Sequence, residues 1–128
     1  MSAVPLAGLK VVEFTHMVMG PAAGHILASL GAEVIRVEPI GGDATRRLLG
    51  SGAGYFPMYN RHKASICLDL KAPAGAAAAR DLVRRHHGMD TDQATAFLDL
   101  GGGADLVGGR LDQVGVVLIR LMGAQHVV

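Results

Sequence analysis

The chain has little of three things: aromatic side chains, cysteine and long apolar runs. Of its 128 residues three are Phe, two are Tyr and none is Trp. A core would therefore depend on Ala, Val, Leu and Ile, which bury less area per residue. The single cysteine, Cys67, excludes an internal disulfide and is typical of a reducing, cytoplasmic setting. No run approaches the ~18 uncharged apolar residues of a membrane span, and no signal peptide is evident, so we expect no membrane partner.

Charge is nearly balanced but unevenly placed. The formal net charge of +1 argues against nucleic acid as a partner. Residues 1–85 contain ten Lys or Arg against six Asp or Glu, whereas residues 86–128 contain two Arg against five Asp. The second segment also holds eight of the 18 glycines. We therefore expect two segments, 1–85 and 86–128, with the second rich in Gly and Asp and of unknown structure.

The first 38 residues predict a strand, a helix and a second strand. Residues 9–14 (LKVVEF) and 33–38 (EVIRVE) are rich in β-branched residues. Pro21 suits the first turn of a helix, and Gly31 suits its end. This βαβ unit implies a parallel strand pair with a right-handed crossover. The helix has its apolar positions at Ala23, Ile26, Leu27 and Leu30.

The next residues continue the same α/β pattern. Asp43 is a candidate cap for a short helical turn that runs to Leu49, and residues 55–60 predict a second short helix. Residues 64–70 (ASICLDL) predict a third strand, and residues 73–85 a longer helix whose apolar face includes Leu82 and Val83. The expected fold class is therefore α/β, with a Rossmann-like open parallel sheet.

Beyond Arg85 the pattern is weaker. The pair His86-His87 is interpreted as a surface feature. Residues 91–100 predict a short helix, and residues 114–121 (VGVVLIRL) predict a strand that has no evident partner.

The turn between the first strand and the first helix, residues 15–21, is the strongest candidate for a ligand site. Ligands of open α/β sheets bind outside the carboxyl ends of the strands, and a helix N-terminus offers free N–H groups to anions. An ordinary strand–helix connection is the alternative. The basic segments at residues 60–63 and 46–47, with Lys71, are each interpreted as solvated charge, but together with the turn they suggest a polyanionic small ligand.

Other ligand motifs are absent from the sequence. Neither G-x-G-x-x-G nor the P-loop pattern occurs, which argues against a dinucleotide binder, and Glu38 is interpreted as a solvated strand end. The six histidines have no metal-ligand spacing and Cys67 has no C-x-x-C partner, so we expect no metal.

Several motifs in a fixed order, spanning about residues 5–85, carry a resemblance to a known family. They are PLAGLKVVEFTH at 5–16, Gly20-Pro21, LGAEVIRVE at 30–38, Gly42-Asp43 with Thr45-Arg46, Tyr55-Phe56, NRHKASICLDLK at 60–71, and Pro73 with Gly75. This series resembles the opening of the family III (CaiB/BaiF-like) CoA-transferases, the group that contains formyl-CoA transferase, carnitine CoA-transferase and the α-methylacyl-CoA racemases. The sheet predicted here is incomplete relative to the fold of that family.

The resemblance implies transfer of coenzyme A between carboxylic acids, with acyl-CoA as the small-molecule substrate. It places CoA contacts at two segments, which are Val18 and Met19 in the first and Leu68, Asp69, Leu70 and Lys71 in the second. A basic residue often follows the acid of the second strand in this family. Pro39 occupies that position here, so Arg36 or Arg46 would have to replace it.

The resemblance leaves the catalytic residue unassigned. Family members are much longer, form interlocked homodimers, and use an aspartate beyond the matched segment to form a mixed anhydride. The aspartates available here, none within the family's motif, are Asp90, Asp92, Asp99, Asp105 and Asp112. We therefore expect a truncated or frameshifted member, or the product of a gene rearrangement. Apolar helices and sheet edges that the missing part of the fold would cover are expected to cause self-association or aggregation, which sedimentation velocity can test. The alternative is a catalytically inactive CoA- or nucleotide-binding remnant.

Overall fold

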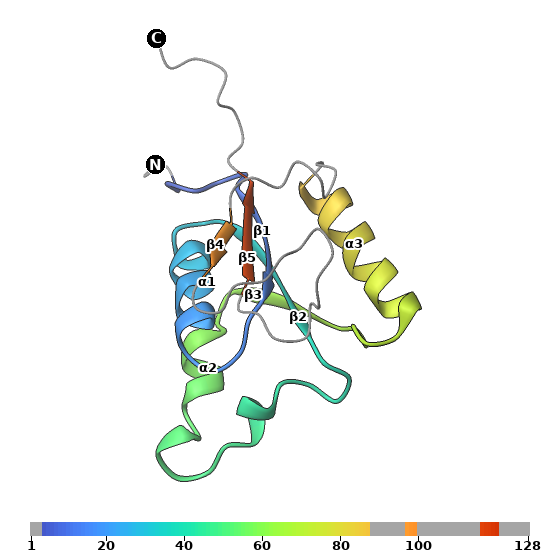
Figure 1. Ribbon diagram of the computed structural model, residues 1–128. Coiled ribbons are helices and arrows are strands. Elements are labelled where there is room, and N and C mark those ends of the chain that lie inside the picture. The colour runs from blue at the N-terminus through green and yellow to red at the C-terminus, as the bar shows by residue number, and fades with distance from the viewer. Residues whose placement is uncertain (1–3, 88–96, 100–115, 121–128) are drawn as a thin grey trace.

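Five strands form one mixed sheet in the order β3-β2-β1-β5-β4. The computed structural model describes residues 4–87, 97–99 and 116–120 (Figure 1). The main elements are β1 (Lys10–Phe14), α1 (Met19–Ser29), β2 (Glu33–Glu38), α2 (Tyr55–Tyr59), β3 (Lys63–Cys67), α3 (Pro73–His87), β4 (Phe97–Asp99) and β5 (Val116–Arg120). Two short 3-10 helices, Ala44–Arg47 and Gly50–Gly52, lie between β2 and α2.

The N-terminal half of the sheet is parallel. β1 pairs with β2 and β2 with β3, and both pairs run in the same direction, with Val12 opposite Ile35 and Ile35 opposite Ala64. The predicted βαβ unit and α/β class are therefore confirmed. Because parallel strands end at one edge, the segments that follow β1, β2 and β3 all leave the sheet on the same side.

Two apolar clusters cover opposite faces of this parallel half. Successive side chains of a strand point to opposite faces, so Val11 packs toward α1 while Val12 and Phe14 pack toward α3. Figure 1 shows the two helices on opposite sides of the sheet. The α3 face includes Val83 and half-buried Leu82, as the sequence predicted.

The other half of the sheet is antiparallel and comes from the C-terminal segment. β5 pairs with β1, and β4 pairs with β5. The described part of the strand predicted at 114–121, Val116–Arg120, therefore pairs with β1, which local sequence could not show. The predicted helix at 91–100 is wrong over Phe97–Asp99, where backbone pairing with β5 replaces helical hydrogen bonds. Residues 91–96 and 100 lie outside the described residues.

The buried face of α1 differs from the predicted one. Its buried residues are small, namely Gly20, Pro21, Gly24 and Ala28. The side chain of Ile26 is 59% exposed and Leu30 is also exposed, so the predicted apolar face is wrong at these two positions. Small residues are needed there because α1 lies close to the side chain of Glu13: a Cβ on Gly24 would come 1.8 Å from its Oε2 atom.

Several smaller expectations are also settled. Asp43 caps the first 3-10 helix by accepting the N–H of Thr45 at 2.8 Å. β3 ends at Cys67, three residues before the predicted end. His86 belongs to α3 and is buried, with its Nε2 atom 3.4 Å from the Glu33 carbonyl oxygen, so its interpretation as a surface residue is wrong.

Among the described residues, no helix is both long and apolar enough to cross a membrane.

Candidate functional site: a charged network and the carboxyl edge of the sheet

The sheet face beneath α1 changes from apolar to charged toward the carboxyl ends of the strands. Side chains two residues apart share a face, so the residues beyond Val11 and Val34 on this face are charged or polar. They are Glu13 on β1, Arg36 and Glu38 on β2, and Lys63 and Ser65 on β3. Glu13, Arg36 and Glu38 are each at most 1% exposed. Buried charges of this kind require partners, and each of the three has them.

One half of this network is centred on Glu13. Its Oε1 atom accepts hydrogen bonds from Arg36 Nη1 at 2.8 Å and from Thr15 Oγ1 at 2.6 Å. Lys63 Nζ donates to Glu13 Oε2 at 2.8 Å and to the carbonyl oxygen of Pro21, in the first turn of α1, also at 2.8 Å. Burial lowers the pKa of Lys63, and the Glu13 carboxylate opposes that shift.

The other half is centred on Glu38. Arg46 binds this carboxylate with two atoms, Nε at 2.8 Å and Nη2 at 2.6 Å, while Ser65 Oγ and the Asp43 N–H also donate to it. The hydrogen bond from Arg46 is the main reason that the pKa of Glu38 falls to about 2, since burial acts in the opposite direction. The guanidinium of Arg46 lies over the ring of Phe56, 3.8 Å from its centroid.

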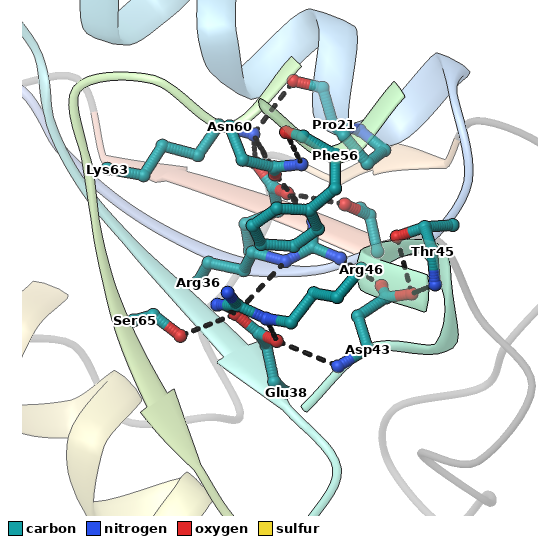
Figure 2. Close-up of polar contacts among 12 residues, drawn as sticks. Pro21, Arg36, Glu38, Asp43, Thr45, Arg46, Phe56, Asn60, Lys63 and Ser65 are labelled. Atoms are coloured by element: carbon teal, nitrogen blue, oxygen red, sulfur yellow. Dashed lines mark hydrogen bonds and ion pairs between the residues drawn. The ribbon is translucent and has the colours of Figure 1, made fainter. Parts of the chain in front are cut away.

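Arg36 joins the two halves. Its guanidinium contacts Glu13 and Asp43 and donates to Asn60 Oδ1 at 2.9 Å. Figure 2 shows these side chains converging from the strands, the loop after β2 and the end of α2. The charged network thus consists of three carboxylates (Glu13, Glu38, Asp43) and three cations (Arg36, Arg46, Lys63). Because charges of opposite sign are matched in number, the network holds the β2–β3 connection against the sheet without leaving an excess charge.

The network overturns two interpretations of single residues. Glu38 is not a solvated strand end, because it is enclosed by Arg46, Ser65 and the Asp43 backbone. Lys63 is not solvated either, because its side chain is 1% exposed. The exposed neighbours of Lys63 in the same basic segment, at 61 and 62, do fit that interpretation.

The structure also decides which arginine can face a ligand from this region. Arg36 is enclosed by carboxylates and inaccessible. Arg46 has a side chain that is 42% exposed, although two of its nitrogen atoms bind Glu38. The sequence signal for the network is a charged or polar residue at every second position, 36 and 38 on β2 and 63 and 65 on β3, but only the strand register brings these side chains together.

The candidate turn, residues 15–21, follows the carboxyl end of β1 and includes the first residues of α1. Val18 is the N-terminal cap of α1 and makes no side-chain capping hydrogen bond. The first N–H groups of a helix have no partner within it, so this end of α1 carries a partial positive charge. Met17 adopts a positive φ of 64°, which is strained for a residue with a Cβ by roughly 1–2 kcal/mol. Met17 and Met19 are both exposed, and Val18 is half-buried.

The second expected segment, Leu68–Lys71, leaves the same edge of the sheet after β3. Leu68 and Leu70 are half-buried against the α3-side cluster, whereas Asp69 and Lys71 are exposed. Asp69 Oδ1 accepts the N–H of Lys71 at 3.1 Å, which fixes a local turn. A Cβ on Gly75 would lie 1.9 Å from the Asp69 carbonyl oxygen, so only glycine lets α3 begin this close.

The structure gives little information on the candidate catalytic aspartates and on a metal site. Asp90, Asp92, Asp105 and Asp112 lie outside the described residues, and Asp99 is described only as part of the β4 backbone. Within the described residues, no cluster of three or more His, Cys, Asp or Glu side chains is placed to hold a metal ion.

Acid is expected to unfold the chain in part through Glu38. Its folded pKa of about 2 lies below the value of 4.5 for a free carboxyl, so its contribution is complete above pH 4.5 and is lost as the pH falls toward 2. That contribution is on the order of 3 kcal/mol. Urea unfolding should show that the difference in unfolding free energy between the parent and Glu38→Gln becomes smaller as the pH falls toward 2. A difference that stays constant with pH would contradict the lowered pKa of Glu38.

Comparison with known proteins gives one consistent family. A family model described as CoA-transferase family III matches residues 6–86. The succinate–glutarate CoA-transferase of Agrobacterium fabrum is 44% identical over 91 residues, covering 62% of this chain and 23% of its own length. The formyl-CoA:oxalate CoA-transferase of Streptomyces coelicolor is 39% identical over 89 residues, covering 66% of this chain and 22% of its own length.

Comparison with solved structures gives the same family. The hypothetical protein Rv3272 from Mycobacterium tuberculosis is 41% identical with a TM-score of 0.61, covering 66% of this chain and 24% of its own. A CaiB/BaiF family protein from Brucella suis is 41% identical with a TM-score of 0.58, covering 65% of this chain and 24% of its own. The chain spans about a quarter of the length of these relatives. With the matched residues forming the parallel half of the sheet and both segments at its carboxyl edge, the chain belongs to the CoA-transferase family III.

Proposed function

We propose that residues 4–87 bind the coenzyme A moiety of an acyl-CoA, and that the protein they belong to transfers CoA between carboxylic acids. The observation that supports this most is the coincidence of two boundaries. The family match ends at residue 86, and the parallel α/β unit ends with α3 at His87. This unit is the proposed CoA-binding segment, while the residues beyond it form the proposed divergent segment.

The carboxyl edge of the sheet offers the chemistry that CoA needs. CoA carries phosphates at its nucleotide end and a long, mostly neutral arm that leads to the thioester. The α1 N-terminus supplies free N–H groups for an anionic oxygen, and Lys71 supplies an exposed cation. Val18 and exposed Met19 supply apolar contact for the arm.

The second segment is proposed to act mainly through its shape. Leu68 and Leu70 are anchored in the α3-side cluster, so they hold the backbone of the segment in place. Asp69 accepts the N–H of Lys71, which defines a local turn from which the exposed Lys71 side chain extends. The mixed-anhydride route that the family resemblance implies needs a carboxylate nucleophile, and we assign that role to no described residue.

Calorimetric titration with CoA tests the proposal. We expect the 128-residue chain to bind CoA at millimolar ligand and Val18→Asp to bind at least ~10-fold more weakly, because a new carboxylate would repel the phosphates. Ile26→Asp is the matched control, since it adds the same charge to an exposed position of the same helix. It should leave the affinity within about twofold. Absence of binding by the parent chain would refute the proposal.

A further inference from the structure

The turn from Thr15 to Pro21 forms a hydrogen bond at each end to a member of one buried ion pair. At its start, Thr15 Oγ1 donates to Glu13 Oε1 at 2.6 Å. At its end, Lys63 Nζ donates to the Pro21 carbonyl oxygen at 2.8 Å. Lys63 and Glu13 are joined to each other at 2.8 Å, and their side chains are 1% and 0% exposed. These contacts close a ring of polar interactions beneath the turn.

The conformation of the turn needs such support. Met17, at its middle, has a positive φ of 64° and an exposed side chain, so its own packing does little to hold it. Strained backbone persists only where its surroundings over-determine it. Gly20 allows the helix to lie directly on Thr15, since a Cβ there would come 2.4 Å from the Thr15 Cβ. The ion pair and this close contact are thus the interactions that hold the two ends of the turn.

We propose that the ion pair Glu13–Lys63 positions the CoA-binding turn, so that the free N–H groups at the start of α1 point toward the ligand. Lys63 comes from β3, 42 residues after Pro21 in the chain, and reaches across the sheet face to the helix carbonyl. Arg36 keeps its own contact with Glu13. Loss of Lys63 therefore frees the turn at its helical end while leaving Glu13 paired. This inference rests on the proposed CoA site.

Two readouts test the positioning role in the 128-residue chain. The first is the set of amide NMR shifts without ligand, and the second is calorimetric affinity for CoA. Lys63→Met should shift or broaden the amides of residues 17–20, leave those of β2 in place, and weaken CoA binding by roughly tenfold. Ser65→Ala is the matched control, because it removes a hydrogen bond to Glu38 from the same face of β3 without touching the turn. It should change neither readout.

A second variant covers the case in which Lys63→Met does not fold. Thr15→Val keeps the shape and charge of the site but removes the donor at the start of the turn, so it should produce the same amide changes. If the parent chain does not bind CoA, the proposed function fails, and the ligand-free amide shifts alone decide the positioning role. Unchanged amides at 17–20 in a folded Lys63→Met, or in Thr15→Val if Lys63→Met is unfolded, would overturn the inference.

Discussion

Replacing Gly24 with alanine is expected to destabilise the chain by about 3 kcal/mol or more, a large share of the 5–15 kcal/mol that small domains have. The new Cβ would lie 1.8 Å from Glu13 Oε2 and 3.1 Å from Lys63 Nζ. Both atoms belong to a buried ion pair, so either the pair separates or α1 lifts from the sheet. The higher helix propensity of alanine offsets only up to ~1 kcal/mol of this cost.

Urea unfolding of Gly24→Ala and Gly54→Ala measures the effect against a matched control. Gly54 has a φ of −87° and nothing within 4 Å of an added Cβ, so its replacement should change stability by less than about 0.5 kcal/mol. Equal midpoints for Gly24→Ala and the parent would show that α1 does not lie on Glu13 as described.

The second large effect is expected at Arg36. Arg36→Met removes the cation that contacts Glu13 and Asp43, and leaves two buried carboxylates short of a partner. Breaking a buried pair on one side costs about 3–5 kcal/mol, so the variant should be largely unfolded or close to it. Arg36→Lys should recover only part of this loss, because one ammonium cannot reproduce a planar fork that contacts Glu13, Asn60 and Asp43 together.

The control for this series is an exposed ion pair on α3. Arg85 pairs with Asp81 at 2.8 Å, one helical turn apart, and its side chain is mostly solvent-exposed. Arg85→Ala should cost no more than ~0.5 kcal/mol. If Arg36→Met and Arg85→Ala had similar unfolding free energies, the charged network would not be a stabilising centre of this fold.

The parallel half of the fold was predictable because its signals are local. The β-branched runs around Val12 and Ile35, and Pro21 and Gly31 at the ends of the helix region, each act within a few residues of their own position. The Asp43 cap has the same local character and is confirmed. By contrast, the pairing of β5 with β1 joins residues about a hundred positions apart, and no pattern near Val116 announces it.

The charged network was missed for a different reason. Taken singly, a charged residue such as Lys63 or Glu38 is more often solvated than buried, so each was interpreted that way. What buries them is their shared face, which depends on the register between β1, β2 and β3. The prediction of the buried side of α1 was wrong for a similar reason. Large side chains such as Ile26 dominate an apolar pattern, but it is Gly24 that lies against the side chain of Glu13. The CoA contacts themselves, such as Val18 and Lys71, stay a prediction.

The central claim is that CoA binds at the carboxyl edge of the parallel strands, and an NMR titration of the chain with CoA tests it most directly. Amide shifts should move at residues 15–20 and 68–72, the segments that follow β1 and β3. The last turn of α3 serves as an internal reference, because His86 lies beside Glu33 at the opposite edge of the sheet. Its amides should stay in place. Shifts confined to that opposite edge, or no shifts at millimolar CoA, would contradict the claim.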